Sequence, residues 1–159
     1  MKLPEAPIPS EGFVVTHFLT VSDQAKSREF YAGILGGKVL NRENPCVIKL
    51  ANTWIILNNG GGPTPDKPDV FLEPPQNPSR VNSFLNLRVA DIGACYNDWK
   101  SKGAEFITEP LDNHGWETRC YMRDPDGYII EVGESSETMA ELYRSQAARF
   151  QPRPPDQSA

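Results

Sequence analysis

Six residues in the second half of the chain have side chains that could bind or transform a small oxygenated molecule. They are Asn86, Arg88, Glu117, Arg119, Tyr121 and Glu131. Guanidinium groups bind carboxylates, phosphates or enolates through paired N–H donors, and a partly desolvated glutamate can accept a proton at neutral pH. The arginines and glutamates could instead form structural ion pairs, and both interpretations stay open at this point.

The spacing of these residues places them on one face of a predicted sheet. Side chains alternate along a strand, so Glu117, Arg119 and Tyr121 project from one side of the segment ETRCYM. Asn86 and Arg88 share one side of VNSFLNLRV in the same way, and Glu131 lies in a third strand-like run, YIIEVG. The wet side of an antiparallel sheet would show this pattern too. The face therefore either contacts solvent or lines a site.

Both halves of the chain show the same order of predicted elements. In the first half, residues 13–22 indicate a strand, residues 23–35 a helix, and the runs KVL, CVIKLA and TWIILN three more strands. In the second half, VNSFLNLRV predicts a strand, the stretch from Asp91 to Gly103 a helix, and EFI, ETRCYM and YIIEVG three more strands. The triplets VSD and VAD open the two helices. Asp23 and Asp91 are therefore expected to be helix N-caps.

The chain is expected to divide into six segments. They are an N-terminal tail at 1–12, a first module at 13–58, a Pro/Gly-rich linker at 59–80, a second module at 81–133, an amphipathic helix at 134–150 and a tail at 151–159. The prolines of both tails oppose regular structure. The segment DPDG at 124–127 predicts a tight turn between two strands, to which we assign no chemistry.

The composition argues against several classes of protein. A net charge of −5 without a basic cluster disfavours nucleic acid and anionic membrane as partners. A mean hydropathy of −0.49 and the lack of a long apolar run disfavour a membrane span. The cysteines Cys46, Cys95 and Cys120 form no C-x-x-C pair. We expect them to be reduced and to pack as small apolar residues in a cytoplasmic protein.

Two segments carry a resemblance to a known family. The first module's VSDQAKSREFYAGILGGKVL and the second module's RDPDGYIIEVGE resemble the opening and the closing hairpin of the vicinal oxygen chelate superfamily. This group includes glyoxalases, bleomycin-resistance proteins and extradiol dioxygenases. The resemblance implies an α+β fold of two βαβββ modules, whose curled mixed sheets surround a cavity. A C-terminal helix would follow these modules.

The resemblance also implies four metal-ligand positions, which correspond here to Thr16, Ile56, Phe84 and Glu131. Only the last of these is a metal-binding side chain, and a tight site needs three or more protein ligands. We therefore expect no cofactor. A divalent metal is possible only if His17 turns inward and joins Glu131. Strand alternation places His17 on the core face instead, although a bulge would reverse its direction.

The cavity implied by the resemblance would be lined from both modules. Its expected binding residues are Thr16, Phe18, Trp54, Asn58, Phe84, Asn86, Arg88, Glu117, Arg119 and Tyr121, with Glu131 as the catalytic base. One hypothesis is a lyase, isomerase or dioxygenase-type enzyme that acts on an oxygenated, anionic substrate. The alternative is a non-catalytic binder of a drug or natural product. Both hypotheses include a homodimer, since family members commonly complete their barrels by pairing chains.

Overall fold

The computed structural model describes residues 15–136 and 141. The expected tails at 1–12 and 151–159, and nearly all of the expected helix at 134–150, lie outside the described residues. Within the described part, no helix is long and apolar enough to cross a membrane.

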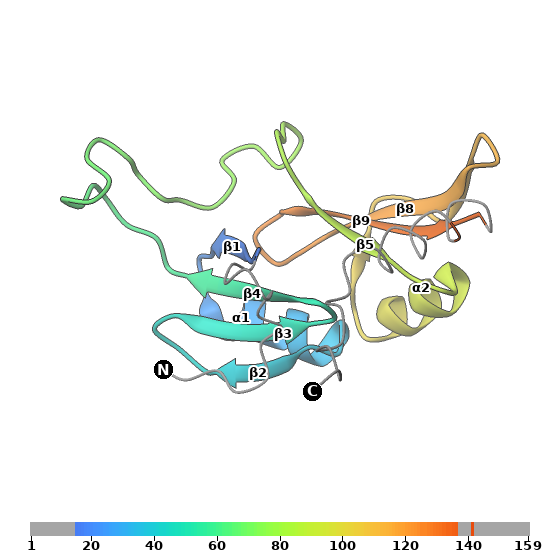
Figure 1. The fold of residues 1–159 in the computed structure, drawn as a ribbon, viewed down its shortest axis with the longest axis horizontal. Helices are drawn as coiled ribbons and strands as arrows, with labels where there is room; N and C mark the ends of the chain where they lie inside the picture. Colours follow the sequence, from blue (N-terminus) through green and yellow to red (C-terminus); the bar gives the residue numbers. More distant parts are fainter. Residues whose placement is uncertain (1–14, 137–140, 142–159) are drawn as a thin grey trace, which may run out of the picture.

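The two modules follow one another along the chain, as Figure 1 shows. The first contains β1 (His17–Thr20), α1 (Gln24–Arg28), the π-helical turn η1 (Glu29–Ile34), β2 (Lys38–Asn41), β3 (Cys46–Leu50) and β4 (Thr53–Asn58). The second contains β5 (Leu85–Arg88), α2 (Ile92–Ser101), β6 (Glu105–Phe106), β7 (Leu111–Asn113), β8 (Glu117–Arg123) and β9 (Ile129–Ser135).

The two sheets have equivalent topologies, which confirms the predicted duplication. The strand order is β1-β4-β3-β2 in the first sheet and β5-β9-β8-β6 in the second, with β7 also paired to β8. In each module the first strand runs parallel to the last, and the other pairs are antiparallel. The predicted α+β class with two curled mixed sheets is therefore confirmed.

Aspartates start both predicted helices as N-caps. The Asp23 carboxylate accepts hydrogen bonds from the backbone N–H of Ala25 at 2.8 Å and of Lys26 at 3.1 Å. Asp91 accepts one from the N–H of Ala94 at 2.8 Å. The N-cap prediction is thus confirmed in both modules.

The first helix, however, widens into η1 after Arg28, which no residue pattern predicted. This wider turn lies where two neighbouring aromatic residues, Phe30 and Tyr31, are both buried and meet edge to face at 5.0 Å. An ordinary helical turn separates adjacent side chains by about 100°. Aromatic packing in the core therefore accompanies the irregular turn.

The strands of the second module differ from the sequence-based prediction in several places. Strand β5 begins at Leu85, so Phe84 lies just before it. Strand β7 was not predicted because it lacks an apolar alternation. It forms through pairing of Leu111 with Arg119 and of Asn113 with Glu117. Strand β9 continues to Ser135, past the expected module boundary at 133.

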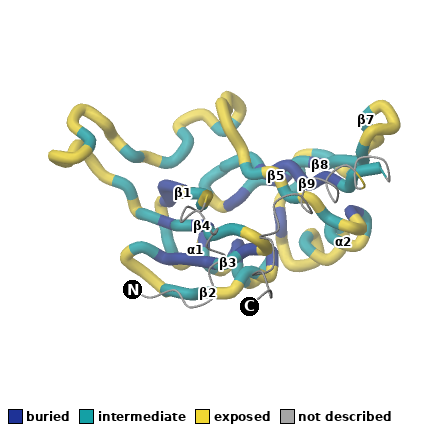
Figure 2. Tube along the Cα trace, in the orientation of Figure 1, coloured by how far each residue is buried: buried dark blue, intermediate teal, exposed yellow. Residues whose placement is uncertain are grey.

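The linker at 59–80 runs over the surface and is largely exposed (Figure 2). Gly61 and Leu72 exchange backbone hydrogen bonds of 3.0 and 2.9 Å, which close a loop between them. This loop leaves the side chain of Phe71 70% exposed. Apart from this bridge and another between Thr64 and Lys67, residues 59–80 form no helix or strand.

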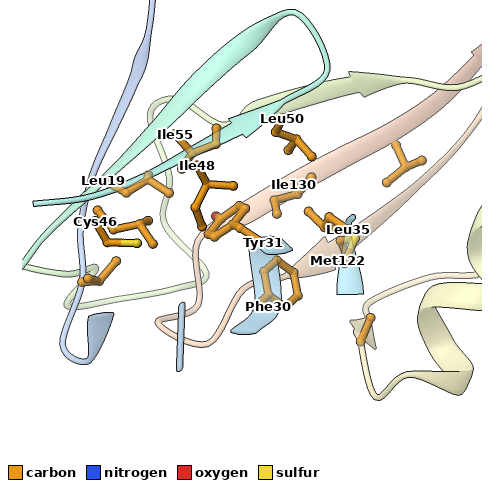
Figure 3. Packing of buried hydrophobic residues seen from close by; sticks show 14 of the residues in the cluster. Leu19, Phe30, Tyr31, Leu35, Cys46, Ile48, Leu50, Ile55, Met122 and Ile130 are labelled. Atoms are coloured by element: carbon orange, nitrogen blue, oxygen red, sulfur yellow. The ribbon is translucent and has the colours of Figure 1, made fainter. Parts of the chain in front are cut away.

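A single apolar core joins both modules (Figure 3). Leu19, Ile48 and Ile55 of the first sheet pack with Tyr31 and with residues of the second sheet, including Met122 and Ile130. Cys46 and Cys120 are fully buried, as expected. Burial raises the pKa of all three cysteine thiols, to about 11 for Cys120. These thiols therefore stay protonated and behave as small apolar groups.

The turn at 124–127 connects the two modules. The Asp124 carboxylate accepts a hydrogen bond of 2.9 Å from the hydroxyl of Tyr31. The Asp126 carboxylate accepts hydrogen bonds from the backbone N–H and the hydroxyl of Ser22. The Tyr128 hydroxyl donates to the carbonyl of Thr20 at 2.9 Å. The sequence pattern of this turn predicts only a connection between two strands.

Candidate functional site

The six residues singled out by spacing lie together on one face of the second sheet. Strand register places Asn86 beside Glu131 and Glu131 beside Tyr121. In the next row, Arg88 lies beside Gly133, which lies beside Arg119. Residues directly opposite each other on neighbouring strands project to the same side. We call this surface the network face, because hydrogen bonds connect all six side chains.

Glu131 lies at the centre of the network face and is only 4% exposed. Its Oε1 accepts hydrogen bonds from Nδ2 of Asn86 at 2.7 Å and from Nη2 of Arg88 at 3.4 Å. Its Oε2 accepts one from the hydroxyl of Tyr121 at 2.7 Å. Burial and this bond to a carboxylate raise the pKa of Tyr121. The tyrosine therefore keeps its proton and acts as a donor.

Glu117 is held in a similar way at the other end of the face. Its carboxylate accepts hydrogen bonds from Arg88, from Nδ2 of Asn113 at 3.1 Å, and from Nη1 of Arg119 at 3.4 Å. Desolvation raises the pKa of Glu117, but the hydrogen bonds and the positive charges outweigh it and lower that pKa overall. Glu117 is therefore ionised at neutral pH.

Arg119 differs from Arg88 in how its donors are used. Arg88 bonds both carboxylates, whereas Arg119 donates one hydrogen bond of 3.4 Å, to Glu117. The side chain of Arg119 is 37% exposed, and its Cζ lies 5.9 Å from the ring centre of Tyr121. A guanidinium has five N–H donors. Arg119 therefore retains donors for a ligand.

Aromatic side chains border the network face where the two modules meet. The rings of Phe84 and Tyr121 meet edge to face with centroids 6.1 Å apart. Phe84 is 44% exposed and Phe18 of the first module is 47% exposed. Both phenylalanines line a small crevice of about 80 Å³, together with His17 and Tyr128. A flat ligand could contact these rings beside the polar groups.

A larger cavity of about 600 Å³ borders strand β5. Its lining comes from β5, including Asn86 and Arg88, from Trp99 of α2, and from the β3–β4 turn at residues 51–53. This volume lies within the range of small-molecule sites. The network face thus adjoins a concavity along its β5 edge.

Three other expected binding residues, Trp54, Asn58 and Thr16, belong to the first module. Trp54 and Asn58 lie on β4, on the face that carries Phe18. Asn58 uses its Oδ1 to accept a hydrogen bond of 2.8 Å from the backbone N–H of Gly60, and so holds the start of the linker. Nε1 of Trp54 is buried without a hydrogen-bond partner. Thr16 lies just before β1 and is half-buried.

The residues present do not fit a divalent metal. His17 pairs with Ile55, a core residue, and shares its face with Leu19, so it lies on the core side of β1. Burial lowers the pKa of His17. Within residues 15–136 and 141, no group of three His, Cys, Asp or Glu side chains could hold an ion. Both oxygens of Glu131 already accept protein hydrogen bonds, so we derive no metal chemistry here.

Two participants in the network were missed by the sequence analysis. Asn113 lies on the unpredicted strand β7, although the turn residues that follow it, His114 and Gly115, both have positive φ and form a recognisable hairpin signal. Gly133 has no side chain to attract attention. A Cβ atom placed there would overlap Nη1 of Arg88 and lie 3.1 Å from its Cζ. Only the folded arrangement shows that this position is crowded.

The fold and sequence now identify the family. The model of the Glyoxalase/Bleomycin resistance protein/Dioxygenase superfamily matches residues 14–132. The chain belongs to this superfamily. A probable lactoylglutathione lyase from Synechocystis is 25% identical to it over 147 residues, which cover 78% of this chain and 96% of that protein.

Solved structures of the superfamily share the fold at low sequence identity. TnmS3, an antibiotic-binding protein from a Streptomyces species, matches with a TM-score of 0.56 and 21% identity, covering 78% of this chain and 98% of that one. FosX, a fosfomycin resistance protein from Listeria monocytogenes, matches with a TM-score of 0.62 and 17% identity, covering 83% and 97%. At such identities the likeness establishes the fold alone.

Proposed function

We propose that this protein binds a small, oxygenated, anionic molecule with a planar part on the network face, and that binding rather than metal-dependent catalysis is its function. The central observation is the different use of the two arginines. Arg88 bonds two carboxylates, those of Glu117 and Glu131, whereas Arg119 makes one long contact, to Glu117; the two side chains are similarly exposed, at 35% and 37%. Arg119 would hold the anionic group, and Tyr121 and Phe84 would contact the flat part.

The hydrogen bonds that hold both oxygens of Glu131 support binding over proton transfer. Glu131 is buried and accepts hydrogen bonds on both oxygens. A general base must reach the proton that it removes. For Glu131 to act as a base, the Tyr121 hydroxyl would first have to leave Oε2. The side chains bonded to Glu131 instead form a pre-organised polar surface. Pre-organised polar groups favour ligand affinity because little ordering is needed on binding.

A second candidate is a metal-independent lyase or isomerase. The contact of 2.7 Å between the Tyr121 hydroxyl and Glu131 places a proton donor beside a proton acceptor. In this mechanism Glu131 would take a proton next to a carbonyl, and Arg88 and Arg119 would stabilise the negative charge that develops on the carbonyl oxygen. Because one relative is named as a probable lactoylglutathione lyase, formation of lactoylglutathione is the reaction to test for this candidate.

Two matched fluorescent probes test the binding proposal. The probe 8-anilinonaphthalene-1-sulfonate is flat and anionic, and N-phenyl-1-naphthylamine is its uncharged counterpart. We expect Arg119→Ala to weaken sulfonate binding about tenfold, the order for a lost charged hydrogen bond, and to leave the neutral probe unchanged. Equal losses for both probes would reject Arg119 as the anion-binding group. Formation of lactoylglutathione from methylglyoxal and glutathione tests the second candidate.

A further inference from the structure

We infer that Gly133 is a positioning residue that leaves Arg119 available for anionic ligands, by giving Arg88 a path across β9. This inference rests on the proposed function of the network face. Gly133 lies in the interior of the second sheet, between Arg88 on β5 and Arg119 on β8. It is buried, and it belongs to the row that carries both guanidinium groups.

Gly133 provides space for the Arg88 guanidinium, and its backbone conformation does not need a glycine. Gly133 lies in strand β9 and does not have a positive φ, so any amino acid could adopt its backbone conformation. A Cβ atom at this position would overlap Nη1 of Arg88, approach its Cζ to 3.1 Å, and lie 3.6 Å from Oε2 of Glu117. Glycine weakens a strand interior and often marks the close approach of another group. Here the approaching group is the Arg88 guanidinium.

The space over Gly133 determines which arginine pairs with Glu117 and Glu131 on the network face. Arg88 crosses β9 at this point and bonds both Glu117 on β8 and Glu131 on β9. A side chain at 133 would push the guanidinium off this line and deprive Glu117 of one donor. The other cation that bonds Glu117 is Arg119, whose Nη1 lies 3.4 Å from it. Arg119 would then be drawn into the protein's own ion pair and would lose donors for the ligand.

The first experiment compares two glycine substitutions in the full chain. Gly133→Ala should weaken 8-anilinonaphthalene-1-sulfonate binding about tenfold, the order for a lost charged hydrogen bond, with N-phenyl-1-naphthylamine unchanged. Gly93→Ala is the matched control, because a Cβ there meets Asp91 Oδ1 only at 3.5 Å, an ordinary contact. It should alter neither affinity. Unchanged sulfonate binding in folded Gly133→Ala would overturn the inference.

A double-mutant cycle shows whether Gly133 acts through Arg88. When Arg88 is replaced by alanine, a Cβ at position 133 no longer meets a guanidinium. The double variant Arg88→Ala/Gly133→Ala should therefore bind the sulfonate as tightly as Arg88→Ala does. The melting temperatures of the same four proteins should show the same lack of additivity. Additive losses in both measurements would refute the coupling. If Gly133→Ala alone fails to fold, recovery of the fold in the double variant supports it, and continued failure opposes it.

These measurements separate the inference from the proposal on which it rests. If Arg119→Ala leaves sulfonate binding unchanged, the network face is not the anion site and the proposed function fails. The melting cycle still reports whether residue 133 and Arg88 compete for the same space. If instead Arg119→Ala weakens binding and the cycle is additive, the proposed function stands and the role of Gly133 fails.

Discussion

The hydroxyl of Tyr31 donates a hydrogen bond of 2.9 Å to the carboxylate of Asp124, and thereby joins the first module's η1 to the second module's turn. Both groups are buried. The same turn contributes Asp126, which accepts from Ser22. These bonds are specific contacts between modules whose other shared contacts are largely apolar. The strength of the bond between Tyr31 and Asp124 depends on the ionisation of Asp124.

Asp124 should make stability depend on pH. Burial raises the pKa of Asp124 from 3.8 to about 6 in the folded protein. The folded state therefore binds more protons than the unfolded state between about pH 4 and pH 6. The free energy of unfolding should fall as pH rises through this interval, by about 3 kcal/mol from this group. Asp124→Asn should remove that contribution, measured by urea unfolding from pH 3.5 to 7.

The control for this experiment is Asp98→Asn, which replaces a carboxylate that is 53% exposed on α2. Its unfolding profile should parallel that of the unaltered protein. If Asp124→Asn also gives a parallel profile, Asp124 does not titrate with a raised pKa in the folded protein.

Two substitutions of Glu131 should show whether its shape and hydrogen bonds or its charge stabilise the fold. Glu131→Ala would leave the donors of Asn86 and Tyr121 without an acceptor, and removing one partner of a buried polar cluster costs on the order of 3 kcal/mol. Glu131→Gln retains an acceptor and the shape, so we expect a smaller loss, about 1 kcal/mol. Thermal and urea unfolding check the order. Equal losses of stability in both variants would show that the charge of Glu131, and not its shape and hydrogen bonds, stabilises this cluster.

Glu131→Gln also addresses catalysis. We expect it to retain affinity for 8-anilinonaphthalene-1-sulfonate within about threefold, since Arg119 and Tyr121 remain. If the unaltered protein forms lactoylglutathione, a Glu131 base requires that this activity disappear in Glu131→Gln. Turnover that survives the substitution would exclude Glu131 as the base. Arg119→Ala, which keeps the Tyr121–Glu131 pair, is the complementary variant.

No stoichiometric transition metal should remain with the purified protein. Thr16, Ile56 and Phe84 occupy three of the positions that hold ligands in the resemblance described above, and His17 lies on the core side of β1. Elemental analysis after dialysis tests this expectation. One equivalent of iron, nickel, manganese or zinc that disappears in His17→Ala would contradict it. The matched variant His114→Ala replaces an exposed histidine in a turn and should have no effect.

The chain should form a two-fold symmetric dimer. Strands β1 and β5 each have one strand neighbour in their sheets, and Phe18, Phe71 and Trp116 are 47%, 70% and 62% exposed. Pairing of two chains is a common way to cover open edges and apolar residues. Light scattering at micromolar concentration should give about twice 17.7 kDa. A species of 17.7 kDa alone would reject the dimer.

Features of the fold that depend on nearby residues could be predicted from the sequence. The period of two in ETRCYM predicts the shared side of Glu117, Arg119 and Tyr121, because alternation follows from the geometry of an extended chain. Asp23 and Asp91 predict two helix starts, because a cap bonds amides two or three residues away. The repeated order of elements similarly predicts two equivalent sheets.

Features that depend on distant residues were decided only by the tertiary structure. Gly133 acts through Arg88 on another strand, and Asp126 reaches Ser22 across 104 positions in the chain. Residue spacing predicts which side of a strand a group faces. It does not predict which partner that group meets, because the pairing of strands within a sheet and the packing of the two sheets bring distant residues together.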